Sequence, residues 1–268
     1  MLKDITLGQY FPGNSFIHRL DPRTKLIVLV VYIVALFLAV NWVSYALMAA
    51  FLVLCIKIST IPAKSFIRGM KPLLMILIFT GVLNLFFTTD GKVLVDFWVV
   101  TITTAGLQRA IFMVVRILLL ICGTFLLTYT TSPISLTDGL EALMNPLKKL
   151  KVPVHELSMM MCIALRFIPT LIEETDKIMS AQKARGADFE SGTLMEKAKA
   201  LDPILVPLFI SAFRRADELA TAMECRCYQG GEGRTKMKLL RYTSWDFRAF
   251  LVAALVLAAI VTLRTFGL

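Results

Sequence analysis

The sequence has few charged residues for its length. Only 18% of its 268 residues are Asp, Glu, Lys or Arg, whereas 57% are hydrophobic, and the mean hydropathy is +0.73. Soluble domains contain about 25% charged and about 45–50% apolar residues. One soluble core cannot bury this much apolar surface, so the composition argues against an ordinary soluble domain and predicts a polytopic membrane protein.

Cysteine and histidine are too sparse for a disulfide framework or a metal site. The five Cys are an odd number and contain no paired CxxC motif. One of the two His opens the segment 155–159, which has Met where a zinc-protease motif needs its second His. Cys225 and Cys227 have no nearby His, so we predict no metal site. An intramembrane enzyme with a Ser–His dyad stays open as an alternative, although neither His lies in a predicted span.

The chain also lacks a nucleotide-binding motif. The glycine-rich stretch 230–236 does not follow the pattern G-x-x-x-x-G-K-[ST] after a strand, so we expect a flexible loop there. We therefore predict no cofactor in this chain and no enzymatic activity. No cleavage site follows the first apolar run, which indicates that no signal peptide is removed.

Five apolar stretches are predicted to cross the membrane. A helix N-terminal cap is predicted before the first stretch, at Asp21-Pro22. Another is predicted at the start of the last stretch, where Thr243 and Asp246 form a capping-box pattern. The first two stretches are short and form a predicted hairpin. The five are 26–40, 45–56, 72–88, 102–131 and 245–266.

The basic residues predict the orientation. Lys and Arg precede the first span and fill the loop between the second and third, whereas the loop at 89–101 has only Lys92. Because Lys and Arg concentrate on the cytoplasmic side, the N-terminus is predicted inside and the C-terminus outside. The net charge of +10 then reflects topology, and we expect no nucleic-acid partner. The predicted organisation is spans one to four in 1–131, a cytoplasmic platform in 132–244 and span five in 245–268.

The platform is predicted to contain an amphipathic helix followed by two long helices. Leucines repeat at four and three residues from 136 to 150, with Pro146 as a bend. The two long helices match at an offset of 41, which pairs Asp176 with Asp217 and Arg185 with Arg226. A single Arg in the last turn of a helix is explained by its favourable interaction with the helix dipole. Two Arg residues at matching positions of a repeat predict two equivalent receptors.

Three segments carry a family resemblance. They are 21–25, 184–189 and 222–228, and they resemble the transmembrane coupling subunit, EcfT, of energy-coupling factor (ECF) vitamin transporters in the ABC superfamily. The resemblance implies an all-α polytopic membrane protein with five transmembrane helices and long cytoplasmic-side coupling helices that end in X-Arg-X motifs. It also implies a multi-pass protein of the bacterial cell membrane.

The resemblance implies a non-catalytic scaffold that couples ATP hydrolysis to vitamin uptake. The implied partners are two ABC ATPase subunits, which bind ATP and Mg, a vitamin-binding S component, and the lipid bilayer. The family's second motif usually ends in Gly where this chain has Cys227, which predicts that the second helix ends later, nearer Gly230. The implied ATPase-binding residues are Ala184, Arg185, Gly186, Cys225, Arg226 and Cys227.

A methionine cluster is the candidate contact for the S component. Met159, Met160 and Met161 stand in a row before Ala164, and unbranched, polarizable side chains suit partners of different shape. Packing within the bundle is the alternative. An ordinary ABC permease that forms the substrate path itself also stays open, because Arg109 and Arg116 lie in the fourth span, where a charge is a functional hypothesis by default.

Overall fold

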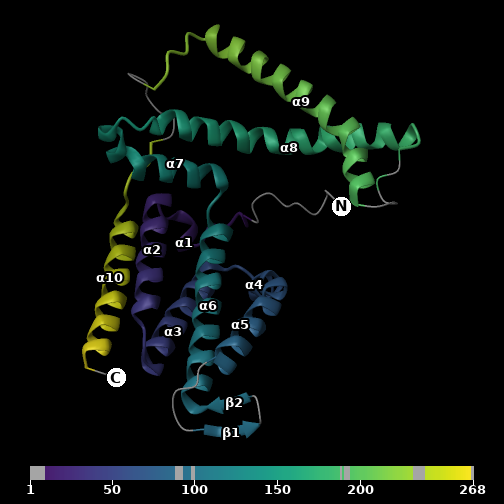
Figure 1. Cartoon of the computed structure of the whole chain (residues 1–268). Helices are drawn as coiled ribbons and strands as arrows, with labels where there is room; N and C mark the ends of the chain where they lie inside the picture. Colours follow the sequence, from purple (N-terminus) through teal and green to yellow (C-terminus); the bar gives the residue numbers. More distant parts are fainter. Residues whose placement is uncertain are drawn as a thin grey trace. The chain divides into compact units, whose positions relative to one another are not determined.

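The computed structural model describes residues 10–87, 93–97, 100–187, 189, 194–231 and 239–266. It divides into two compact units. We call Gly8–Gly139 with Leu240–Leu268 the bundle unit, and Leu140–Leu239 the hairpin unit. Figure 1 shows the elements of both units. The predicted platform, 132–244, has different boundaries from the hairpin unit, and its role stays a prediction.

The bundle unit is built from long apolar helices. Within it α5 packs along α6 and α10 packs along α2 (Figure 1). Its core contains the fully buried Leu36, Met48 and Ile260, and Tyr32 donates a hydrogen bond to the carbonyl of Leu119 at 3.1 Å. Its helices are α1 (Phe16–Arg19), α2 (Pro22–Leu38), α3 (Trp42–Ser59), α4 (Ala63–Met70), the 3₁₀ turn η2 (Lys71–Leu73), α5 (Leu74–Phe87), α6 (Thr104–Thr130) and α10 (Ser244–Thr265).

Five helical stretches of the described chain are long and apolar enough to cross a membrane. The number agrees with the prediction, but the set differs by one member. The 17 residues of α2 rise about 26 Å, which is at the short end for a span, and α2 is not among the five. The five are Trp42–Ser59, Ala63–Leu85, Thr104–Thr130, Val154–Ala184 and Ser244–Thr265.

A two-stranded hairpin joins α5 to α6, where the sequence predicted only a loop at 89–101. Strand β1 (Val93–Phe97) pairs antiparallel with β2 (Val100–Thr103). Both strands are rich in β-branched residues, which favour extended structure. The two strands do not change the all-α class, which is confirmed by the helices on either side.

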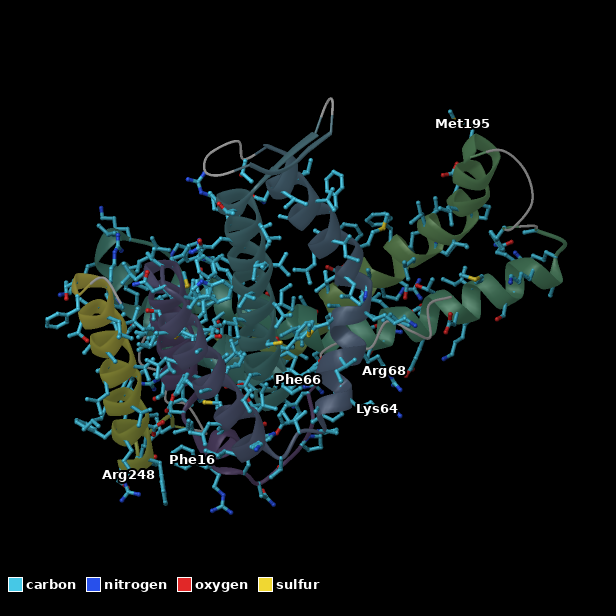
Figure 2. All side chains as sticks on the ribbon, turned by 90° about the horizontal axis from the view of Figure 1, so that it is seen from below. Phe16, Lys64, Phe66, Arg68, Met195 and Arg248 are labelled. Carbon is cyan, nitrogen blue, oxygen red and sulfur yellow. The ribbon has the colours of Figure 1, made fainter. Side chains whose placement is uncertain are left out.

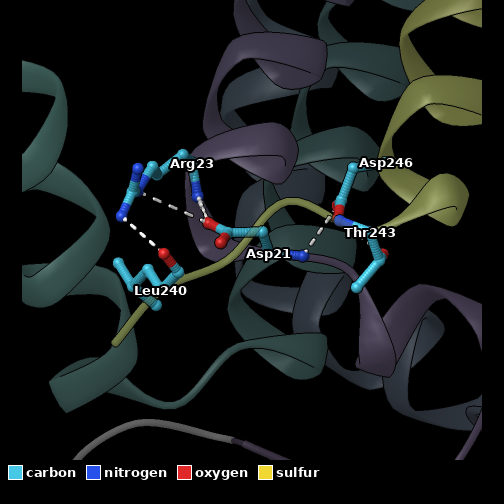
Figure 3. Close-up of polar contacts among 5 residues, drawn as sticks. All are labelled: Asp21, Arg23, Leu240, Thr243 and Asp246. Carbon is cyan, nitrogen blue, oxygen red and sulfur yellow. Dashed lines mark hydrogen bonds and ion pairs between the residues drawn. The ribbon is translucent and has the colours of Figure 1, made fainter. Parts of the chain in front are cut away.

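The N-termini of α2 and α10 are fastened together by one buried carboxylate (Figure 3). Asp246 accepts hydrogen bonds from the backbone N–H of Asp21 at 2.9 Å and of Thr243 at 2.7 Å. Asp21 in turn caps α2 by accepting from the N–H of Arg23 at 2.9 Å. Both predicted caps are therefore confirmed. The guanidinium of Arg23 reaches the carbonyl of Leu240 at 3.3 Å.

Arg116 has a structural role inside the bundle. Its Nε donates to the hydroxyl of Tyr45 at 2.9 Å, and its guanidinium donates to the carbonyl of Ala39 at 3.2 Å. Ala39 ends α2, so Arg116 satisfies a carbonyl that the helix leaves without a partner. This agrees with pairing inside the bundle and gives no support to a substrate path.

The hairpin unit consists mainly of two long helices. Helix α7 (Pro133–Met144) begins in the bundle unit and gives way to the 3₁₀ helix η3 (Asn145–Leu150) at the predicted bend. Helices α8 (Val154–Ala184) and α9 (Leu194–Glu224) have 31 residues each. Pro169 lies inside α8, and Pro203 and Pro207 lie inside α9, where each removes a helical N–H donor.

Candidate functional site

The first Arg motif lies at the end of α8. Arg185 is the C-cap, and Gly186 follows it in the left-handed region with φ of 90°. The N–H of Ala187 donates to the carbonyl of Gln182 at 3.0 Å, and the N–H of Gly186 donates to that of Lys183 at 3.0 Å. This pair of bonds is the Schellman termination, which needs a residue of positive φ. Gly186 meets that need without steric cost.

The second motif repeats this geometry at the same offset. The N–H of Tyr228 donates to the carbonyl of Met223 at 3.1 Å, and the N–H of Cys227 donates to that of Glu224 at 2.8 Å. Cys227 has a φ of 56°, in the place of Gly186. The prediction that this helix ends nearer Gly230 is therefore wrong. The two hydrogen bonds hold Cys227 in a conformation that costs a non-glycine residue about 1 kcal/mol.

All six predicted ATPase-binding residues are exposed. The structure records no hydrogen bond or ion pair from the guanidinium of Arg185 or Arg226 to any other described residue. Each guanidinium therefore keeps its planar set of five N–H donors, which matches a carboxylate in bidentate fashion. Two exposed guanidinium groups, with no partner among the residues that have described positions, therefore lie at equivalent ends of two helices.

Helices α8 and α9 form an antiparallel hairpin. Glu174 on α8 accepts hydrogen bonds from Ser211 Oγ and from Arg215 at 2.7 Å. Nearer the turn, Gln182 Nε2 donates to the carbonyl of Pro203 at 3.5 Å. That carbonyl needs a donor because Pro207, four residues on, has no N–H. Figure 1 shows the two helices running in opposite directions.

The antiparallel arrangement separates the two Arg motifs. Beyond α9 the chain returns to the start of α8, where Tyr228 donates to Met159 Sδ at 3.0 Å. Gly231 lies against His155, since a Cβ there would come within 2.4 Å of the imidazole. Arg226 therefore belongs to the N-terminal end of α8 and Arg185 to its C-terminal end. From Met159 to Arg185 the chain advances 26 residues along α8, which sets the separation at about 40 Å.

The methionine cluster divides between packing and surface. Met159 accepts the hydrogen bond from Tyr228, whereas Met160, Met161 and Ala164 are exposed. Their contact with a partner stays a prediction.

His155 Nδ1, in the segment compared with zinc proteases, lies 3.2 Å from a carboxylate oxygen of Glu141.

An apolar stripe on α9 was missed at the level of sequence. Val206, Phe209, Ile210 and Phe213 follow the spacing i, i+3, i+4, i+7 and are exposed, Phe209 by 61% and Phe213 by 68%. This spacing defines one helix face. The sequence analysis predicted a long helix here, but the even apolar composition of the segment conceals the periodicity that indicates an interaction face.

No group of three His, Cys, Asp or Glu side chains suited to a metal ion occurs among the residues for which the structure gives positions. Arg109, the other Arg of the fourth span, is exposed. The chemistry available at the two helix ends is therefore recognition of anionic groups by Arg.

Comparison with known proteins identifies the family. The family model of CbiQ, described as cobalt transport protein, matches residues 13–237. The chain is 55% identical to the energy-coupling factor transporter transmembrane protein EcfT of Thermosediminibacter oceani over 255 residues, 95% of this chain and 96% of the relative. It is 50% identical to EcfT of Bacillus subtilis over 261 residues, 97% of this chain and 98% of the relative. The resemblance drawn from the motifs is confirmed, and the chain belongs to the CbiQ family as an EcfT-type transmembrane component of energy-coupling factor transporters.

Proposed function

We propose that this multi-pass membrane protein couples two ATPase subunits to vitamin uptake through an S component. Arg185 and Arg226 each dock into one ATPase. The chain itself is non-catalytic, and the ATPases bind ATP and Mg. The observation that carries the proposal is the matching termination of α8 and α9, which presents at each end an exposed Arg without a partner among the described residues.

The choice of Arg supports docking into an acidic groove. A helix C-terminus carries a partial negative charge, and a cation there is favoured by about 0.3–1 kcal/mol. That effect alone would be met equally well by Lys. The planar fork of Arg adds bidentate hydrogen bonding to carboxylates, which Lys cannot reproduce.

The separation of the motifs supports two receptors. Two sites about 40 Å apart, at opposite ends of α8, cannot both enter one groove. ATP-driven closure would bring the two ATPases together, and the hairpin would convert that movement into a tilt of α8 against α9. This movement would reorient the S component and release its vitamin inward.

The exposed apolar stripe of α9 and the exposed Met160 and Met161 of α8 are the proposed S-component surface. A row of large exposed side chains at helical spacing suits a partner helix laid along it. Methionine adapts to partners of different shape, so one complex is expected to serve more than one S component.

For the topology we propose a bacterial cell membrane protein with the N-terminus inside and the C-terminus outside. The proposed spans are α2, α3, the stretch Ala63–Leu85, α6 and α10. We assign α8 to the cytoplasmic side although its composition suffices for a span, because after Ile172 it carries Glu173, Glu174 and Asp176. Those charges would be costly within a bilayer.

The test is ATPase binding by Arg variants of the full chain. Arg185→Ala and Arg226→Ala should each weaken binding of one ATPase roughly 10- to 100-fold, since a hydrogen bond to a charged group contributes about 1.5–3 kcal/mol. Lys should restore binding only in part. Arg214→Ala, at an exposed Arg within α9, is the matched control. Equal binding by the double Ala variant and the control would contradict the proposal.

A further inference from the structure

The bundle unit contains an apolar cavity of about 250 Å³ between α2, α3, α6 and α10, roofed by α1. Its walls include Val28 and Leu29 of α2, Phe51 and Cys55 of α3, and Gly123 of α6. Engineered apolar cavities of about 150 Å³ stay dry and bind apolar molecules. A cavity of this size and lining therefore favours an apolar occupant over water.

The cavity opens on the outer surface of the bundle unit. Leu54 and Ile58 of α3 and Val252 of α10 line it and are also exposed. In a membrane protein the exposed apolar face of such helices meets lipid tails.

Both cations of the cavity lining lie near the end where α2 and α10 begin. Lys25 Nζ is buried and donates to the carbonyls of Thr130 at 2.9 Å and His18 at 3.2 Å. Arg248 is exposed and lies over the Trp245 ring, 4.6 Å from its centroid. Among the described residues no carboxylate forms an ion pair with Arg248. The guanidinium of Arg248 can therefore bind an anion.

Aromatic rings mark the same end. Phe16 of α1 meets Trp245 of α10 edge-on, with 5.2 Å between ring centroids. Figure 2, seen from below, shows Phe16 and Arg248 at neighbouring positions. Tryptophan with Arg at the end of an apolar helix is typical of the interface between lipid tails and headgroups. The cavity therefore offers an apolar lining that suits a lipid tail and, at one end, a cation that suits a phosphate headgroup.

We propose that this cavity binds one acyl chain of an anionic phospholipid, whose phosphate is held by Arg248. Basic sites between membrane helices commonly bind anionic headgroups. A segment of the tail fills the space along Val28, Leu29 and Tyr32 of α2, beside the residues of α1 and α3 that also line the cavity. The site needs only that the chain lies in a membrane, and it is independent of how the Arg motifs of the hairpin unit act.

Cys55 provides a direct probe of occupancy. The full chain in detergent is treated with a small maleimide, and alkylation of each Cys is followed by mass spectrometry. Dioleoyl phosphatidylglycerol at about 10 times its Kd should slow alkylation of Cys55 about 10-fold, because only the empty cavity reacts. The exposed Cys225 and Cys227 are internal controls and should react at an unchanged rate.

The headgroup is tested by lipid identity and by Arg248. Phosphatidylethanolamine and oleate with the same tails should protect Cys55 less than phosphatidylglycerol. Arg248→Gln should remove this preference, whereas Arg264→Gln, at an exposed Arg near the other end of α10, should keep it. The proposal is overturned if phosphatidylglycerol gives no protection, if oleate protects equally well, or if Arg248→Gln behaves like Arg264→Gln.

Discussion

Glu174 of α8 and Arg215 of α9 form an ion pair of 2.7 Å between positions 41 residues apart, the same offset that relates Arg185 to Arg226. The hairpin is therefore joined at repeat-equivalent positions. Each of these residues lies 11 positions before its own Arg motif. The two Arg motifs are thus about 16 Å along the helix from this shared contact, so a change of crossing angle moves both by similar amounts.

The ion pair is expected to set the hairpin geometry more than its stability. Both side chains are partly exposed, so solvent screens their coupling and it should contribute little to the free energy of unfolding. Arg215→Glu should lower vitamin uptake with little change in melting temperature, and Glu174→Arg in the same chain should restore uptake. Glu173→Arg, at the exposed neighbour, is the control for the second change and should restore nothing. Equal rescue by both would show that charge balance, not this contact, matters.

Cys227 adopts a left-handed backbone conformation that its residue type disfavours. Cys227→Gly should stabilise the end of α9 by about 1 kcal/mol, because Gly adopts positive φ freely. Cys227→Val should destabilise it and weaken ATPase binding, since a β-branched residue fits this conformation poorly. Amide hydrogen exchange at residues 223–228 measures both effects.

The comparison for that experiment is Cys225→Gly. Position 225 precedes the left-handed residue, so Gly there should loosen the helix end instead of stabilising it. If the Cys225 and Cys227 variants change exchange in the same direction, backbone conformation at Cys227 is not the cause.

The sequence predicted much of the fold and of the candidate site. The caps at Asp21 and Thr243 were readable because capping depends on side chains within three or four residues. The repeat of Arg185 and Arg226 was readable for a different reason, because two segments 41 residues apart match in sequence. The left-handed Cys227 was not, since residue preference favoured Gly230 and only the hydrogen bonds of Tyr228 and Cys227 override it.

Contacts between residues far apart in the chain could not be predicted from the sequence pattern. Pairing of Asp246 with the N–H of Asp21 joins residues 225 positions apart, which no local signal indicates. The hairpin β1–β2 was missed because its short strands lie in a stretch with loop-like acidic and glycine residues. The stripe through Phe209 had a signal in its spacing, but the even apolar composition concealed it.

Substitutions in the apolar stripe of α9 should affect binding of S components but not binding of the ATPases. Phe209→Lys and Met160→Lys should each reduce association with several S components, because they add a charge to an apolar contact, and should leave ATPase binding unchanged. Phe247→Lys, at a residue of α10 that is 78% exposed, tests whether any new charge has this effect. Loss of S-component binding by the Phe247 variant alone would move the contact surface to α10.

The native thiols test the topology. In a chain lacking Cys55, Cys122 and Cys162, a membrane-impermeant maleimide should label Cys225 and Cys227 only after cells are permeabilised. Lys92→Cys in a chain without native thiols should be labelled in intact cells, because its loop is proposed to lie outside. Labelling of Cys225 or Cys227 from outside would reverse the proposed side of α9.

Uptake per ATP hydrolysed tests the coupling account most directly. The complete complex, with its ATPases and an S component, is reconstituted in liposomes, and vitamin uptake and ATP hydrolysis are measured together for the wild type, Arg185→Ala, Arg226→Ala and the double variant. We predict that each single change lowers uptake per ATP and that the double change abolishes uptake while any ATPases retained still hydrolyse ATP. Uptake per ATP at the wild-type level in the double variant would contradict the account, because the two Arg would then only cap their helices.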